Sequence, residues 1–182
     1  MAIEKKILNK EEIDNIIIES SKKIFSDIED LSNFAIIGIH TRGVELADRI
    51  RKEIEKISGK EIKHGTLDIS FYRDDLTTRG KLPVLKETLI EFNINNMNIL
   101  LVDDVLFSGR TTKAALETLT AFGRPYTIKL FVLVDRGGRE LPIQPDYCGF
   151  KIDTQQDDQV NVRLFQTDNV VDSVYLVNEK KL

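Results

Sequence analysis

The sequence has little that would suit a membrane, a zinc site or an oxidising compartment. Its 182 residues include one cysteine, Cys148, and two histidines, so an internal disulfide is impossible and no Cys/His cluster suggests zinc. No apolar run approaches the roughly 20 residues that span a bilayer, and no signal peptide is recognisable. We therefore expect a cytoplasmic chain without a membrane partner.

Charge of one sign is not in excess either. The formal net charge is −4, with 41% hydrophobic and 31% charged residues. This balance is ordinary for a globular protein and provides no overall attraction for nucleic acid. Repeats, low-complexity segments and linkers are not evident, so residues 1–182 are expected to form a single domain.

One stretch organises the chain. Residues 99–102 are all apolar and branched, which is typical of a strand buried on both faces. Asp103 and Asp104 come directly after this run, and a turn containing Ser108 and Gly109 then opens a helix. The apolar positions expected along that helix are Ala115, Leu116, Leu119 and Phe122.

Strand, acidic pair, turn and helix start together suggest a site for a phosphorylated sugar. The first N–H groups of a helix lack intrahelical partners and attract anions. Gly109 allows close approach, while Ser108 and Thr111 add hydroxyl donors. Asp103 and Asp104 would repel a phosphate, but they suit a pair of hydroxyls. Ribose 5-phosphate has both groups. The alternative is an ordinary turn, which would explain a lone acidic pair equally well.

This stretch resembles the phosphoribosyl pyrophosphate (PRPP) signature of type I phosphoribosyltransferases. The resemblance implies an α/β fold with a central, mostly parallel sheet flanked by helices, a small hood and a flexible lid loop. It assigns the ribose hydroxyls to Asp103 and Asp104. The PRPP-binding loop that follows would comprise Val105, Leu106, Phe107, Ser108, Gly109, Arg110 and Thr111.

Two further strands end in polar residues. The apolar run 34–39 ends at residues 40–43, where Arg42 and the turn amides could hold a second anion before a helix over about 44–57. The run 126–134, apolar nearly throughout and interrupted by Lys129, ends at residues 135–143, which carry several charges. Because ligands bind beyond the carboxyl ends of parallel strands, we expect all three strand ends to share one site.

Four blocks, at 39–43, 67–76, 99–111 and 134–143, resemble the PyrR family of pyrimidine operon regulators with uracil phosphoribosyltransferase activity. This resemblance covers about residues 13–164 and implies conversion of PRPP and uracil to UMP and diphosphate. It implies a diphosphate loop of Thr41, Arg42 and Gly43, with Arg42, Asp103 and Asp104 as catalytic residues. The lid, from Tyr72 to about Lys86, would include Tyr72, Arg73, Asp74, Asp75 and Arg79. Uracil would be bound by Asp135, Arg136, Gly137 and Val160.

The chemistry implied is positioning and neutralisation of charge around an oxocarbenium-like ribose. Mg²⁺ is the expected cofactor, held mainly by PRPP without a dedicated protein cage. Phe107 favours a pyrimidine, because purine-using relatives usually have an Asp there and a Phe cannot transfer a proton. Two alternatives remain: a purine phosphoribosyltransferase, and a nucleotide-sensing RNA regulator with weak catalysis.

The sequence retains few basic residues that could bind RNA. Family members that bind messenger RNA use basic residues on the N-terminal helix and near the last block, where this chain has Ile18, Glu19, Asp27, Gly138 and Gln144. The remaining candidate RNA contacts are Lys22, Lys23, Arg139 and Lys151. Losing cationic contacts lowers affinity, so we expect weak or absent RNA binding. The family suggests a homodimer or homotetramer.

The other elements are predicted from local patterns. Asn9 and Glu12 have the spacing of a capping box, which predicts a helix to about Asp27. Alternating polarity predicts a half-exposed strand over 66–71. Shorter strands are expected near 147–152, 160–164 and 174–177.

Overall fold

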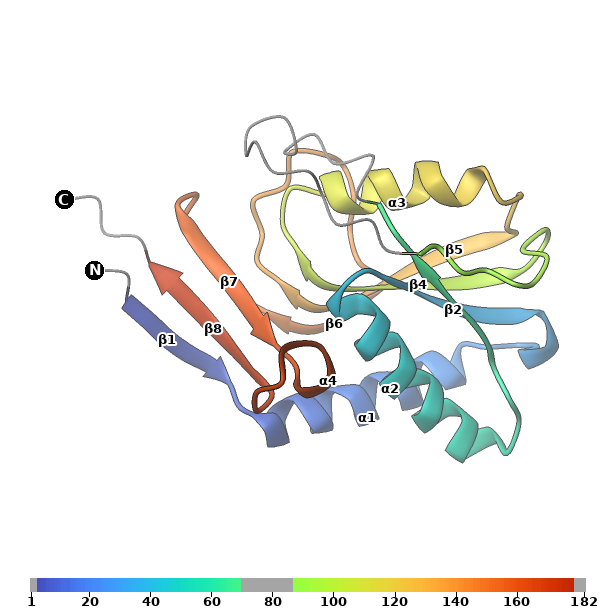
Figure 1. Ribbon diagram of the computed structural model, residues 1–182, viewed down its shortest axis with the longest axis horizontal. Coiled ribbons are helices and arrows are strands. Elements are labelled where there is room, and N and C mark those ends of the chain that lie inside the picture. Colours follow the sequence, from blue (N-terminus) through green and yellow to red (C-terminus); the bar gives the residue numbers. More distant parts are fainter. Residues whose placement is uncertain (1–2, 70–86, 179–182) are drawn as a thin grey trace.

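The computed structural model describes residues 3–69 and 87–178, which form two sheets (Figure 1). The larger sheet has five strands in the order β3-β2-β4-β5-β6, and every neighbouring pair is parallel. Its strands are β2 (Phe34–Ile39), β3 (Lys63–Leu67), β4 (Asn98–Leu106), β5 (Thr127–Asp135) and β6 (Tyr147–Lys151). All six residues of β2 are buried, as expected for an interior strand of a parallel sheet.

Helices cover both faces of this sheet. On one face lie α1 (Lys10–Ser26) and α2 (Arg42–Ser58), and on the other lies α3 (Arg110–Thr120) (Figure 1). Each face has its own core. Ile13, Ile17 and Ile24 of α1 belong to the first core, while Ala115 and Leu119 of α3 belong to the second.

The smaller sheet, here called the hood, is antiparallel with the order β1-β8-β7. It consists of β1 (Ile3–Leu8), β7 (Asp158–Arg163) and β8 (Ser173–Asn178), with α4 (Phe165–Asp168) between β7 and β8; η1 (Leu31–Asn33) lies apart, between α1 and β2. The carboxyl ends of the large sheet's strands point toward the hood (Figure 1). The expected architecture, with a central parallel sheet, flanking helices and a hood, is confirmed.

Several local predictions are also confirmed. Asn9 and Glu12 form both hydrogen bonds of the capping box at the start of α1. Gly59 ends α2 in the left-handed conformation, with φ of 66°. Strands occur at all three expected positions in the last third of the chain.

Other boundaries were wrong. The strand predicted to end at Val102 continues to Leu106, so both aspartates lie within β4. The helix expected from Val44 begins at Arg42. The strand expected over 66–71 ends at Leu67. Phe122, expected as an apolar position along the third helix, lies beyond α3 and is 44% exposed.

The first strand, β1, was missed because residues 3–8 are largely exposed and carry three charges, and only pairing with β8 organises them. The expected lid, from Tyr72 to about Lys86, lies outside the described residues. Within residues 3–69 and 87–178, no helix has the length and apolar character required to cross a membrane.

Candidate active site

The turn before α2 lies directly against the acidic pair of β4. A Cβ placed on Gly43 would lie 2.4 Å from the carbonyl oxygen of Val102 and 3.2 Å from the Cα of Asp103. Only glycine allows this approach, because any side chain would push α2 away from β4. The strand ends that carry Arg42 and the two aspartates are therefore adjacent, as the sequence predicted.

The backbone helps to orient each carboxylate of the pair. Asp103 Oδ1 accepts a hydrogen bond from the N–H of Asp104, and Asp104 Oδ1 accepts one from the N–H of Val105, both at 2.9 Å. Asp103 is buried, with 6% of its surface exposed, whereas Asp104 is half-buried. A half-buried carboxylate with one oxygen fixed can accept hydrogen bonds from a ligand on the other.

Arg42 brings positive charge to the same place. Burial alone would lower the pKa of this guanidinium, but its hydrogen bonds to Asp168 and the nearby charges of Asp104 and Glu45 raise it. Asp104 is thus one of the carboxylates whose charge favours the protonated guanidinium of Arg42. The site combines a guanidinium with carboxylate oxygens that can accept hydrogen bonds.

The turn after β4 packs against the loop that follows β5. Gly109 caps the start of α3 with φ of 92°, and it offers no side chain to the first N–H groups of the helix. The carbonyl oxygen of Ser108 accepts hydrogen bonds from the N–H groups of Glu140 and Leu141, both at 3.0 Å. These bonds hold the PRPP-signature turn against the loop that follows β5.

That loop brings Arg136 and Gly138 to Phe107. The N–H of Arg136 donates to the carbonyl oxygen of Leu106 at 3.0 Å, and its guanidinium carbon lies 3.9 Å from the centroid of the Phe107 ring. A Cβ on Gly138, whose φ is 71°, would lie 2.3 Å from the same ring. Phe107 is thus held between a cation and bare backbone, which fixes the plane of its ring.

Arg136 also connects the site to the segment before the hood. Its Nε donates to Thr154 Oγ1 at 3.0 Å, and its Nη2 donates to the carbonyl oxygen of Gln155 at 3.2 Å. Only 7% of its surface is exposed, and burial lowers the pKa of its guanidinium. Val160, on β7, is half-buried and packs against the first core.

Asp135 and Arg139 form a pair in this loop. Arg139 Nη2 lies 2.7 Å from Asp135 Oδ2, and the N–H of Gly137 donates to Asp135 Oδ1 at 3.1 Å. Arg139 donates further to the carbonyl oxygens of Ile143 and Phe107 at 2.8 and 2.9 Å. The Arg139 guanidinium thus makes these contacts around its own loop, and 14% of its side chain is exposed. Lys22, Lys23 and Lys151 are exposed.

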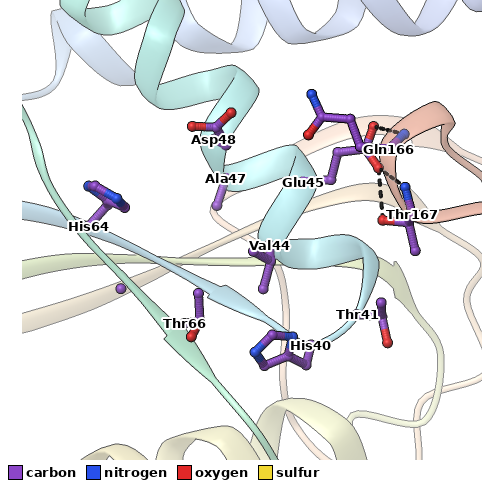
Figure 2. A pocket seen from close by; sticks show the side chains of 11 residues that line it. His40, Thr41, Val44, Glu45, Ala47, Asp48, His64, Thr66, Gln166 and Thr167 are labelled. Atoms are coloured by element: carbon purple, nitrogen blue, oxygen red, sulfur yellow. Dashed lines mark hydrogen bonds between the residues drawn. The ribbon is translucent and has the colours of Figure 1, made fainter. Parts of the chain in front are cut away.

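A pocket of about 560 Å³ adjoins the site through the turn between β2 and α2 (Figure 2). Its wall mixes apolar residues, Val44 and Ala47 among them, with polar ones that include His40, Thr41, Glu45, His64, Gln166 and Thr167. The peptide bond between His40 and Thr41 is cis. Asp103, Asp104 and Arg136 do not line this pocket, so the three strand ends are a separate surface that meets it at residues 40 and 41.

With the three strand ends assembled, sequence comparison decides the family. The model of the phosphoribosyl transferase domain matches residues 4–169. The bifunctional protein PyrR of Desulfosudis oleivorans is 47% identical over 171 residues, which cover 92% of this chain and 94% of that protein. The PyrR protein of Roseiflexus is 44% identical over 174 residues, covering 96% and 95%. The chain belongs to the PyrR family of phosphoribosyltransferases.

Solved structures agree with the PyrR chain in fold. The hypoxanthine-guanine phosphoribosyltransferase of Bacillus anthracis superposes with a TM-score of 0.70 at 18% identity, covering 95% of this chain and 97% of that one. The Staphylococcus aureus hypoxanthine phosphoribosyltransferase gives 0.65 at 22% identity, covering 86% and 80%. At such identities the likeness shows the type I phosphoribosyltransferase fold alone.

Sequence reasoning missed three residues that the fold brings to this PyrR site. Asp168 and Glu45 hold the start of α2 to the hood, and no short motif marks either one. Thr112, in the first turn of α3, is 3% exposed, and its Oγ1 has no hydrogen-bond partner among the described residues. A threonine directly after the signature was the only signal available for it.

Proposed function

We propose that this PyrR-family chain transfers the phosphoribosyl group of PRPP to uracil, forming UMP and diphosphate. The observation that carries the proposal is the convergence of three strand ends, with Gly43 packed against the backbone of Asp103 and Arg136 packed on Phe107. The end of β2, with Arg42, suits diphosphate. The end of β4, with the two aspartates, suits ribose 5-phosphate, and the end of β5, with Arg136, suits a flat base.

The acidic pair has a different task from the cation. Asp104 and Asp103 accept the ribose 2′- and 3′-hydroxyls, which holds the sugar with its C1 toward the base. Arg42 neutralises the diphosphate that departs as the C1–oxygen bond breaks. The C1–N1 bond to uracil forms as the N1–H bond breaks, and the proton leaves with the diphosphate. Helix-start N–H groups of α3 hold the 5′-phosphate. This division of work is mostly positioning and electrostatic stabilisation.

Mg²⁺ is the proposed cofactor. Among the described residues, no group of three or more His, Cys, Asp or Glu side chains could hold a metal ion. The donor set fits an ion that would take most of its ligands from the substrate and that the half-buried carboxylate of Asp104 would help to hold. When bound, Mg²⁺ would supply charge neutralisation at the diphosphate.

Phe107 supports a pyrimidine as the base. Its ring is fixed between Arg136 and Gly138, and a hydrocarbon ring cannot give or take a proton at a base. We expect UMP formation from uracil to exceed IMP formation from hypoxanthine by at least about 10²-fold in kcat/KM, as one lost hydrogen-bonded group discriminates strongly in a buried site. Initial rates with PRPP, Mg²⁺ and each base measure this ratio. Faster turnover of hypoxanthine would replace the proposal with a purine phosphoribosyltransferase.

RNA binding is proposed to be weak. Arg139 is bonded within its own loop, and Gly138 packs on Phe107 with φ of 71°, so neither position presents a cation to a phosphate backbone. Lys22, Lys23 and Lys151 remain, and Lys22 is paired with Glu19 at 2.7 Å. Few phosphate contacts give low affinity with a shallow salt dependence.

A gel-shift titration with the organism's own pyrimidine leader RNA, with and without UMP, tests this regulatory role. We expect no shift below roughly micromolar protein at physiological salt, which is the range of non-specific binding. A tight shift that requires UMP would make the chain a nucleotide-sensing RNA regulator, as the word bifunctional in its relatives' name suggests. The assembly is proposed to be a homodimer or homotetramer, which light scattering after size exclusion measures.

A further inference from the structure

The first half of α2 is joined to the segment between β7 and β8 by a run of charged contacts, here called the hood seam. Its α2 members are Arg42, Glu45 and Arg49, and its hood members are Thr167, Asp168 and Asp172. Glu45 is 4% exposed, and its carboxylate accepts from the N–H groups of Gln166 and Thr167 at 3.2 and 2.9 Å (Figure 2). The seam fixes where the hood lies relative to the turn that carries Arg42.

The contact nearest the site joins Arg42 to Asp168. Arg42 Nε donates to Oδ2 at 2.9 Å, and Nη2 donates to Oδ1 at 2.8 Å. Asp168 Oδ2 also accepts from the N–H of Leu164 at 2.9 Å, so the carboxylate is itself held by backbone. Burial alone would raise the pKa of Asp168, but the hydrogen bonds from Arg42 and Leu164 lower it. The carboxylate is therefore ionised at neutral pH and holds the guanidinium in one orientation.

We infer that Asp168 is the positioning residue for Arg42, an inference that rests on the proposed PRPP chemistry. The two-pronged pair uses Nε and Nη2, and Nη1 makes no hydrogen bond within the described residues. Arginine is long and has many rotamers, so fixing two of its nitrogens removes most of its freedom before the ligand arrives. The remaining nitrogen then faces the diphosphate with its position already set. Asp168 touches no substrate and acts only through Arg42.

Asp172 provides a matched control within the same seam. Like Asp168, it lies between β7 and β8. It accepts a hydrogen bond from the N–H of Phe165 at 2.8 Å and pairs with an arginine of α2. Its partner is Arg49, which lies about two turns further along α2 than Arg42, away from the strand ends. Asp172→Asn therefore weakens the attachment of the hood without releasing Arg42.

The test compares Asp168→Asn with Asp172→Asn in the full chain. For Asp168→Asn we expect the KM for PRPP and the calorimetric Kd of PRPP with Mg²⁺ to rise roughly tenfold, while the KM for uracil and the kcat change less than about threefold. For Asp172→Asn we expect a lower melting temperature with a KM for PRPP within about twofold of wild type. Melting temperatures of both variants show whether they remain folded at the assay temperature.

Each outcome decides a different claim. An unchanged KM and Kd for PRPP in folded Asp168→Asn, or an equal rise in Asp172→Asn, would show that the seam only holds the hood and would overturn the inference. If the wild type binds PRPP but makes no UMP, the proposed reaction fails, and the Kd values of the variants still decide the role of Asp168. If the wild type does not bind PRPP, both the reaction and the inference are overturned.

Discussion

Asp104→Asn should lower kcat/KM for UMP formation by about 10²-fold, because a charge-assisted hydrogen bond to the ribose diol is worth up to roughly 3 kcal/mol. The amide keeps the shape of the carboxylate, and one of its oxygen positions can still accept from the N–H of Val105. The loss should therefore fall on substrate binding and turnover, with little effect on folding. Steady-state rates at varied PRPP measure it, and the melting temperature verifies the fold.

Glu4→Gln is the matched control for this change. Glu4→Gln also removes one negative charge. Glu4 lies in the hood, away from the strand ends, and forms an exposed ion pair with Arg163 at 2.9 Å. Exposed pairs contribute little to stability, and Glu4 is on the outer strand of the hood. Its variant should keep the wild-type kinetics. Wild-type kcat/KM in a folded Asp104→Asn protein would remove Asp104 from the ribose contact.

Gly43→Ala should both destabilise the protein and reduce its activity. The new Cβ would lie 2.4 Å from the Val102 carbonyl oxygen, a distance that can be relieved only if α2 and β4 separate. Overpacking of this kind costs about 1–3 kcal/mol. The separation would also shift Arg42 relative to Asp103, so kcat/KM should fall by at least about tenfold, beyond what the unfolded fraction explains. Urea unfolding and assays well below the midpoint separate the two effects.

Gly59→Ala isolates the effect of a glycine substitution itself. Gly59 ends α2 with φ of 66°, and a Cβ there would meet nothing within 4 Å. The added side chain should cost about 1 kcal/mol of backbone strain and leave the kinetics unchanged. If Gly43→Ala matched Gly59→Ala in activity, the close approach of α2 to β4 would have no role in the site.

The sequence contained most of the site because its chemistry is local. The acidic pair, the turn with Gly109 and the residues around Arg42 each occupy a few consecutive positions at the end of an apolar run. The α/β rule that ligands bind beyond strand carboxyl ends then brings those positions together. The errors in the predicted boundaries did not affect these residues. The helix α2 begins at Arg42 and not at Val44, but Gly43 still lies against β4.

The features that the sequence did not predict depend on contacts between distant parts of the chain. Asp168 lies 126 positions after Arg42, and Glu45 meets Gln166 and Thr167 across more than 120. Neither carboxylate belongs to a periodic pattern, so nothing local distinguishes them from surface acids. The same limit applied to β1, a charged strand that exists through its pairing with β8. For Arg139 the sequence suggested a contact with RNA, whereas in the structure its guanidinium donates hydrogen bonds to the carbonyl oxygens of Ile143 and Phe107.

Calorimetric titration of PRPP with Mg²⁺ into the wild-type and Asp104→Asn proteins is the most direct measurement of the claim that the strand ends form one PRPP site. We predict saturable binding of one PRPP per chain by the wild type and an affinity lower by about tenfold or more for the variant, as expected when a charged acceptor is lost. Equal affinities for the two folded proteins would contradict the account.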